Sequence, residues 1–132
     1  LRLQYLDSEG YPSAEACQRL NEFFRCQYTG EVKPIDPELF LLLDSIRQQL
    51  GATERPYVLF SGYRSAVHNR ILAREDHSVA RKSYHMRGMA ADIALDGVRL
   101  VDIAKTAKRL DIGGVGRYDR FVHVDVGPVR CW

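Results

Sequence analysis

The chain has 132 residues, a formal net charge of +2 and 45% hydrophobic residues, as an ordinary globular domain does. So small a charge gives no support for nucleic-acid binding, and no apolar run reaches the roughly 18 residues of a membrane span. We predict a single domain over residues 1–132, without nucleic-acid partner or transmembrane segment, and expect a monomer. Because the chain begins with Leu1, we expect a fragment or processed product whose export signal would lie upstream.

The first half of the chain predicts two helices. The segment YPSAEACQRLNEFFRCQYTG predicts one that Ser13 caps and that ends just before Gly30. The segment PIDPELFLLLDSIRQQLG predicts another: Asp36 caps it, Pro37 takes the first helical position and Gly51 stops it. The apolar face of this second helix consists of Leu39, Leu42, Leu43, Ile46 and Leu50.

The second half predicts strands with helices between them. YVLFSG predicts a short buried strand at residues 57–62, and SAVHNRILARE predicts a helix that starts near Ser65. After a polar loop, MAADIAL predicts a strand and RLVDIAKTAKRLD a helix; GGVGRYDRFVHVDVG predicts two short strands around a tight connection. The fold class predicted is α+β, with a small, mainly antiparallel sheet packed by helices from the N-terminal half and from between the strands.

The three cysteines are Cys17, Cys26 and Cys131, and no two have the C-x-x-C spacing of a zinc ribbon. In one helix over residues 14–27, Cys17 and Cys26 would lie about 13 Å apart, at about 1.5 Å per residue. A disulfide requires Cα atoms within about 7 Å. At most one of the two could then pair, with Cys131; we favour three free thiols, with the helical ones partly buried.

Two predicted strands each place a candidate metal ligand on a polar face. Alternation along FVHVDV sends the three valines to one face and Phe121, His123 and Asp125 to the other. In MAADIAL, Asp92 shares a face with small alanines, and His85 lies in the loop just before. Two histidines and a carboxylate, with a fourth position open to water, are the usual composition of a catalytic zinc site.

A structural or solvated role is the usual one for a lone histidine in a globular domain. We interpret His68 in this way because its helix shows no partner pattern, and His77 because it lies in a charged loop. The same interpretation would apply to His85 if it stood alone. Spacing by itself leaves a metal site at His85, Asp92 and His123 open.

Three blocks of the sequence, in order, are similar to one known family. They are SGYRS at 61–65, S-x-H-x-x-G-x-A-x-D at 83–92, and GGVGRY…FVHVDVGPVRCW at the C-terminal end. They resemble the zinc peptidases that cleave bacterial peptidoglycan peptides, the superfamily of the D-Ala-D-Ala metallo-carboxypeptidases, and most of all its murein endopeptidase K-like branch. The resemblance covers almost the whole chain, because VKPIDPELFLLLDSIR also fits that branch.

This resemblance implies a zinc-dependent murein endopeptidase with one Zn²⁺ held by His85, Asp92 and His123. It also implies that Arg64 holds the substrate carbonyl or the developing oxyanion, where a fixed cation stabilises the charge that forms. The implied substrate is a peptidoglycan stem peptide or cross-link, cleaved between two diaminopimelate residues in that branch. The expected location is the periplasm or cell envelope.

Three further positions carry weaker implications. Ser83 would support the His85 loop through a hydrogen bond, and Gly88 would let the backbone pack close to the metal. One position departs from the family pattern: many relatives carry an acid three residues before the last histidine as general base, and this chain has Arg120 there.

The departure leaves the general base open. Asp119 is adjacent to Arg120 but would point the other way on a strand. Asp125 shares the face of His123, about 6–7 Å along at about 3.3 Å per residue. We therefore expect Asp125 to be either the general base or a carboxylate partner of His123.

Two other functions stay open. One is a different specificity with the same chemistry, either a D,D-carboxypeptidase or a D-Ala–diaminopimelate endopeptidase, decided by the loops at 63–84. The other is an inactive, zinc-stabilised module that binds the cell wall, which the missing acid at Arg120 favours.

Overall fold

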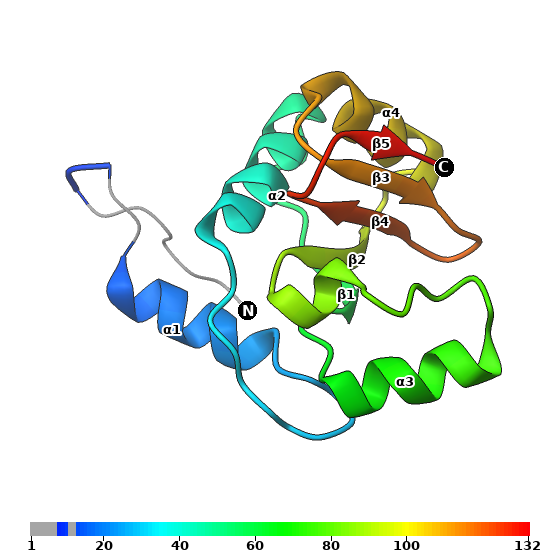
Figure 1. Cartoon of the computed structure of the whole chain (residues 1–132). Helices are drawn as coiled ribbons and strands as arrows, with labels where there is room; N and C mark the ends of the chain where they lie inside the picture. The colour runs from blue at the N-terminus through cyan, green and yellow to red at the C-terminus, as the bar shows by residue number, and fades with distance from the viewer. Residues whose placement is uncertain (1–7, 11–12) are drawn as a thin grey trace.

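The computed structural model describes residues 8–10 and 13–132; Leu1, on which the expectation of a processed chain rests, lies outside them. A five-stranded sheet lies among helices (Figure 1). In chain order the elements are α1 (Ala14–Phe23), α2 (Pro37–Gln49), β1 (Tyr57–Ser61), α3 (Ala66–Glu75), the 3-10 helix η1 (Tyr84–Arg87), β2 (Ala90–Leu95), α4 (Leu100–Leu110), β3 (Gly114–Arg117), β4 (Val122–Asp125) and β5 (Arg130–Cys131). The predicted α+β class is confirmed.

The sheet has the strand order β1-β2-β4-β3-β5. All neighbouring strands are antiparallel except β3 and β5, which are parallel, so a mainly antiparallel sheet is confirmed. In the β2–β4 register Asp92 lies opposite His123, and Ala90 opposite Asp125. Because side chains alternate between faces, this register places Asp92, His123 and Asp125 on one face of the sheet.

The opposite face of the sheet belongs to the hydrophobic core. Ile93 on β2 and Val122 on β4 lie opposite each other in the register, and both are buried. Helix α4 packs against β2, β3 and β4, and α2 packs against α4, so both helices lie on one side of the sheet (Figure 1). Each buried Ile, Leu or Val stabilises the fold by about 1.5–3 kcal/mol relative to an exposed one.

The caps predicted for the first two helices, and the start of the third near Ser65, are confirmed. Ser13 caps α1 and Ser65 caps α3, each by accepting a hydrogen bond from a backbone N–H in the first turn. The Asp36 carboxylate accepts from the Glu38 N–H at 3.0 Å at the start of α2, and Gly51 follows the end of α2 with a φ of +63°. These signals are local, and they place α2 within a residue of its predicted bounds.

The first helix is shorter than predicted, because it ends at Phe23 rather than just before Gly30. Beyond it, the Phe24 carbonyl accepts a hydrogen bond from the Tyr63 N–H. The backbone of Cys26 forms hydrogen bonds with the backbone of Glu31 and Gly30 in a turn. Cys26 therefore lies outside the helix, which corrects the premise of the cysteine argument. The expectation of three free thiols is confirmed.

Two strands differ from the prediction. β1 is an edge strand with β2 as its one partner, and Val58 is 47% exposed, so the expectation of a buried strand is wrong. β5 was not predicted; it pairs with β3 over Gly114–Arg130 and Val115–Cys131. None of the helices in the described part of the chain combines the length and the apolar character needed to cross a bilayer.

Candidate metal centre

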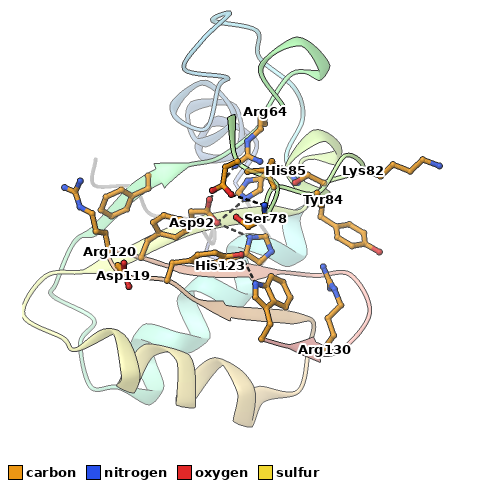
Figure 2. Close-up of a pocket in the computed structure, with 18 residues that line it drawn as sticks. Arg64, Ser78, Lys82, Tyr84, His85, Asp92, Asp119, Arg120, His123 and Arg130 are labelled. Atoms are coloured by element: carbon orange, nitrogen blue, oxygen red, sulfur yellow. Dashed lines mark hydrogen bonds and ion pairs between the residues drawn. The ribbon is translucent and has the colours of Figure 1, made fainter. Parts of the chain in front are cut away.

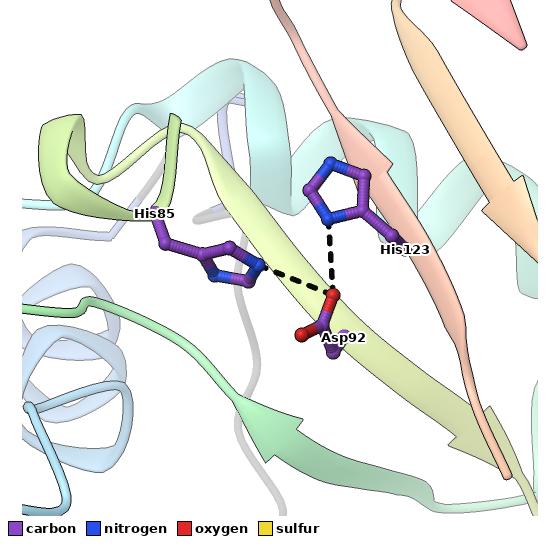
Figure 3. A group of neighbouring side chains, drawn as sticks. All are labelled: His85, Asp92 and His123. Atoms are coloured by element: carbon purple, nitrogen blue, oxygen red, sulfur yellow. Dashed lines mark hydrogen bonds and ion pairs between the residues drawn. The ribbon is translucent and has the colours of Figure 1, made fainter. Parts of the chain in front are cut away.

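Three potential ligands from three elements converge on one point. His85 lies in η1, Asp92 in β2 and His123 in β4, and one ligand atom from each lies within 4.8 Å of the others. Both imidazoles point at the Asp92 carboxylate (Figure 3). Its Oδ1 lies 3.1 Å from His85 Nε2 and 3.0 Å from His123 Nδ1, and all three side chains are buried.

The far nitrogen of each imidazole is held by an acceptor. His85 Nδ1 lies 2.8 Å from the Gly62 carbonyl oxygen, and His123 Nε2 lies 2.7 Å from Asp125 Oδ2. Since a carbonyl and a carboxylate only accept, each of these nitrogens carries the hydrogen. In the neutral imidazoles, the nitrogens that face Asp92 therefore present lone pairs, as metal-binding histidines do.

This arrangement fits a cation. Burial lowers the pKa of His85 and so favours its neutral form, although Asp92 opposes the shift. Burial raises the pKa of Asp92, but when the facing nitrogens carry protons, the hydrogen bonds from His123 and His85 hold this pKa well below its usual range, so the carboxylate is ionised. Lone pairs that face a carboxylate oxygen repel it unless a proton or a metal ion lies between them. Two imidazoles and a carboxylate are the donor set of many catalytic zinc sites.

Arg64 lies beside the three ligands and is itself buried. Its Nη2 is 3.6 Å from Asp92 Oδ2, and its Nη1 donates to Asn69 Oδ1 at 3.0 Å. Asn69 is 1% exposed, and its amide also donates to the Ala80 carbonyl at 2.9 Å. Asn69 therefore holds both Arg64 and the loop after α3. An asparagine within a helix carries no sequence signal for such a role, and Asn69 was not predicted.

Ser83 and Gly88 flank η1, which carries His85. The Ser83 hydroxyl accepts from the His85 N–H at 3.1 Å at the start of this helix. Gly88 ends it with a φ of +66°, and a Cβ there would lie 2.7 Å from the Pro34 carbonyl oxygen. Gly88 thus allows a left-handed turn packed against residues 34–35, which corrects the reason expected for it, namely close approach to the metal.

Asp125 lies behind His123 and is fully buried. Its Oδ2 contacts His123 and Arg130, and its Oδ1 accepts from the backbone N–H groups of Gly114 and Gly127 at 2.9 and 3.0 Å. Burial raises the pKa of Asp125, but the hydrogen bonds from His123 and Arg130 hold this pKa well below its usual range. Asp125 is not among the residues that line the adjoining cavity.

The ligands open onto a cavity of about 760 Å³, a size typical of ligand sites. Figure 2 shows Asp119 and Arg120 at one end of it, Lys82 and Tyr84 at the other, and the three ligands between them. Asp119 and Arg120 lie in the bend between β3 and β4 rather than on a strand. Both line the cavity, so they do not point apart as strand alternation would require.

The two remaining histidines lie outside this cluster, as interpreted from the sequence. His68 stacks on Tyr28 with ring centroids 5.3 Å apart, and its Nδ1 lies 3.6 Å from Cys26 Sγ. His77 is exposed in the loop after α3.

The sequence model of the family described as peptidoglycan L,D-endopeptidase MepK matches residues 1–132. The chain belongs to this family. Over 134 residues it is 42% identical to "Peptidoglycan L,D-endopeptidase MepK" of Escherichia coli K12, covering 100% of this chain and 72% of the relative. Over 117 residues it is 38% identical to "Probable peptidoglycan L,D-endopeptidase MepK" of Haemophilus influenzae, covering 87% of this chain and 63% of the relative.

Among solved structures, the chain is similar to the L-Ala D-Glu endopeptidase ChiX of Serratia marcescens. The TM-score is 0.47 at 19% identity, and the match covers 73% of this chain and 68% of the other. A likeness of this size is too weak to transfer a function. The resemblance to zinc peptidases close to the murein endopeptidase K-like branch is confirmed by the family match and by the MepK relatives.

Proposed function

We propose that this chain is a zinc-dependent endopeptidase that hydrolyses peptide bonds in peptidoglycan. The observation that carries the proposal is the convergence of His85, Asp92 and His123 on one point beside a cavity. Membership of the MepK family supports peptidoglycan as the substrate, because the relatives are named peptidoglycan L,D-endopeptidases. We further propose that residues 1–132 form one peptidase domain, and that it acts in the periplasm or cell envelope.

His85 Nε2, a carboxylate oxygen of Asp92 and His123 Nδ1 would hold the metal. Zinc bound there would supply a water of lowered pKa and would polarise a carbonyl. Arg64 would hold the substrate carbonyl, or the negative charge that develops on its oxygen, because its guanidinium is fixed by Asn69 beside the ligands. A cation already held in place needs no reorganisation when that charge forms.

Asp125 suits a partner of His123 better than a general base. A base must reach the proton that it removes, within about 2.6–3.2 Å or through one water. Both carboxylate oxygens of Asp125 are engaged by protein donors, and the residue does not line the cavity. Asp119 does line the cavity, so we propose Asp119, or a carboxylate of the substrate, as the proton acceptor.

The ends of the cavity suit an anionic peptide. Lys82 and Arg120 lie at opposite ends, with the metal ligands between them (Figure 2). Neither has a hydrogen bond or ion pair with any described residue. Both are exposed. Stem peptides carry free carboxylates, and two diaminopimelate residues would present such groups on both sides of the bond between them. This arrangement supports the bond between two diaminopimelate residues as the one cleaved.

Digestion of purified peptidoglycan sacculi tests the proposal. The muropeptides released by the wild-type chain, with and without a chelator, are identified by mass spectrometry, and the His123→Ala variant serves as the inactive control. We expect chelator-sensitive cleavage of cross-links between two diaminopimelate residues. Release of terminal D-Ala alone would instead indicate a D,D-carboxypeptidase. Cleavage after D-Ala would indicate the D-Ala–diaminopimelate specificity. Binding to sacculi without any product would indicate a cell-wall-binding module.

A further inference from the structure

Arg130, on β5, lies between two aromatic rings at one side of the metal centre. Its guanidinium carbon is 4.9 Å from the ring centroid of Tyr84 and 5.2 Å from that of Trp132. Figure 2 shows Arg130 on the same side of the cavity as Tyr84. Tyr84 directly precedes the ligand His85, and the Trp132 ring lies 5.2 Å from the ring of His123. The cation is thus held next to the elements that carry two of the three ligands.

The Arg130 guanidinium also donates hydrogen bonds to the Asp125 carboxylate, which lies behind His123. Nη1 donates to Asp125 Oδ1 at 3.0 Å and Nη2 to Oδ2 at 2.9 Å, the bidentate geometry in which arginine binds carboxylates best. Nη1 donates in addition to the Pro128 carbonyl at 2.9 Å. Asp125 Oδ2 in turn accepts from His123 Nε2 at 2.7 Å. An uninterrupted line of hydrogen bonds therefore runs from Arg130 through Asp125 to His123.

Three glycines leave room for Arg130 and for the two aromatic rings beside it. A Cβ on Gly114 would lie 2.5 Å from Arg130 Nη1, and one on Gly127 would lie 2.7 Å from the Tyr84 ring. A Cβ on Gly116 would lie 2.3 Å from the Trp132 indole. A side chain at any of these positions would displace part of the cluster. Although the Arg130 side chain is 38% exposed, its contacts therefore belong to the packed structure of the site.

Arg130 lines the cavity, so binding a substrate carboxylate is the competing role. Both terminal nitrogens, however, are already engaged by Asp125 and Pro128. Lys82 and Arg120, on the same cavity, have no such partners among the described residues. The contacts favour a role through Asp125 over direct contact with substrate.

We propose that Arg130 is a positioning residue of the metal centre: it holds the Asp125 carboxylate and thereby orients the imidazole of His123 toward the metal. This inference rests on the proposed zinc function of His85, Asp92 and His123. Groups that orient a ligand in this way typically change metal affinity by about 10–100-fold when they are altered.

The first test compares Arg130→Lys with Arg87→Lys. Lysine keeps the charge but not the planar fork that binds both carboxylate oxygens. Arg87 is a matched control because its guanidinium also stacks on Tyr84, at 5.4 Å, yet it neither lines the cavity nor bonds to Asp125. We expect Arg130→Lys to weaken Zn²⁺ binding by about 10–100-fold, measured by competition with a chromophoric chelator, and Arg87→Lys to bind as the wild type does.

The second test asks whether Arg130 acts through Asp125. Removing Arg130 alone would leave a buried carboxylate without its cation and could unfold the protein. The double variant Arg130→Met with Asp125→Asn removes both charges together, and circular dichroism of the metal-free protein checks its fold. We expect it to bind Zn²⁺ as tightly as Asp125→Asn alone, because both variants lack the Asp125 carboxylate through which Arg130 acts. Co²⁺ spectra of both variants should show the same change in coordination.

Two results would overturn the inference. One is wild-type Zn²⁺ affinity in Arg130→Lys. The other is a further loss of affinity, of tenfold or more, when Arg130→Met is added to Asp125→Asn, which would show that Arg130 acts by another route. A wild-type chain that binds no Zn²⁺ would instead refute the proposed function itself, at the first measurement.

Discussion

Different interactions act on the two faces of the sheet: apolar packing on one and polar contacts on the other. Two neighbouring residues on β2 show the contrast. Ile93 faces the core, where it is buried among the apolar side chains of α2, α4 and the strands. Asp92 faces the other way, toward His85 and His123, with contacts of 3.1 and 3.0 Å. Hydrophobic burial is roughly proportional to area and has no direction, whereas a metal centre depends on the angle of each donor.

The difference teaches that stability and metal binding are separable within one short strand. Substitutions on the apolar face should change the free energy of unfolding and leave metal affinity alone. Substitutions on the polar face should chiefly change metal affinity. Four measurements test this contrast, and they are ordered here by the size of the expected effect.

The largest effect is expected for His85→Ala or His123→Ala. Each removes one of three donor atoms that lie within 4.8 Å of one another. Tight zinc binding should be abolished, while the apolar face stays intact and the protein still folds. Metal analysis of the purified variants checks this, and stoichiometric zinc in both would refute the ligand assignment.

A smaller loss is expected for Asp125→Asn, whose amide has nearly the same shape as the carboxylate. As a partner of His123, Asp125 should contribute about 10–100-fold to zinc affinity, so excess zinc should restore most of the activity. Peptide hydrolysis is measured across a zinc titration. A rate that stays about 10²–10⁴-fold low at saturating zinc would instead make Asp125 the general base.

Arg64→Lys should lower turnover by at least about tenfold, which corresponds to about 1.4 kcal/mol of barrier. Lysine keeps a positive charge near Asp92 but loses the fork that Asn69 holds in place. Zinc content should remain that of the wild type. Steady-state kinetics together with metal analysis decide the point: unchanged turnover would make Arg64 a structural residue.

The smallest effect is expected on the apolar face, for Ile93→Val. Removing one methylene from this 1% exposed side chain should cost about 0.5–1.5 kcal/mol of unfolding free energy. Zinc affinity and turnover should not change, although Asp92 is the adjacent residue. Chemical denaturation and a zinc titration on the same preparation provide the comparison. A tenfold fall in zinc affinity would show that the two faces are coupled.

The amino-acid sequence by itself determined what depends on neighbours along the chain. Asp36, Pro37 and Gly51 set the bounds of α2, because caps and stops act within one helical turn. Alternation along β4 places His123 and Asp125 on one face, since successive side chains of a strand point to opposite sides. The two blocks that carry the ligands could therefore be recognised before their geometry was known.

Tertiary structure alone decided what depends on partners distant in sequence. α1 ends at Phe23 although its sequence favours a longer helix, because the next carbonyl, of Phe24, bonds to the N–H of Tyr63. Arg64 donates a hydrogen bond to Asn69, and Arg130 donates to Asp125. Both bonds form only because the fold brings these side chains together. A helical asparagine and an arginine near the end of the chain resemble solvated residues in sequence. Asn69 and the Asp125 carboxylate are buried, and burial is a property of the packed molecule. Burial makes their hydrogen bonds obligatory, since an unpaired polar group in the interior costs about 1–3 kcal/mol.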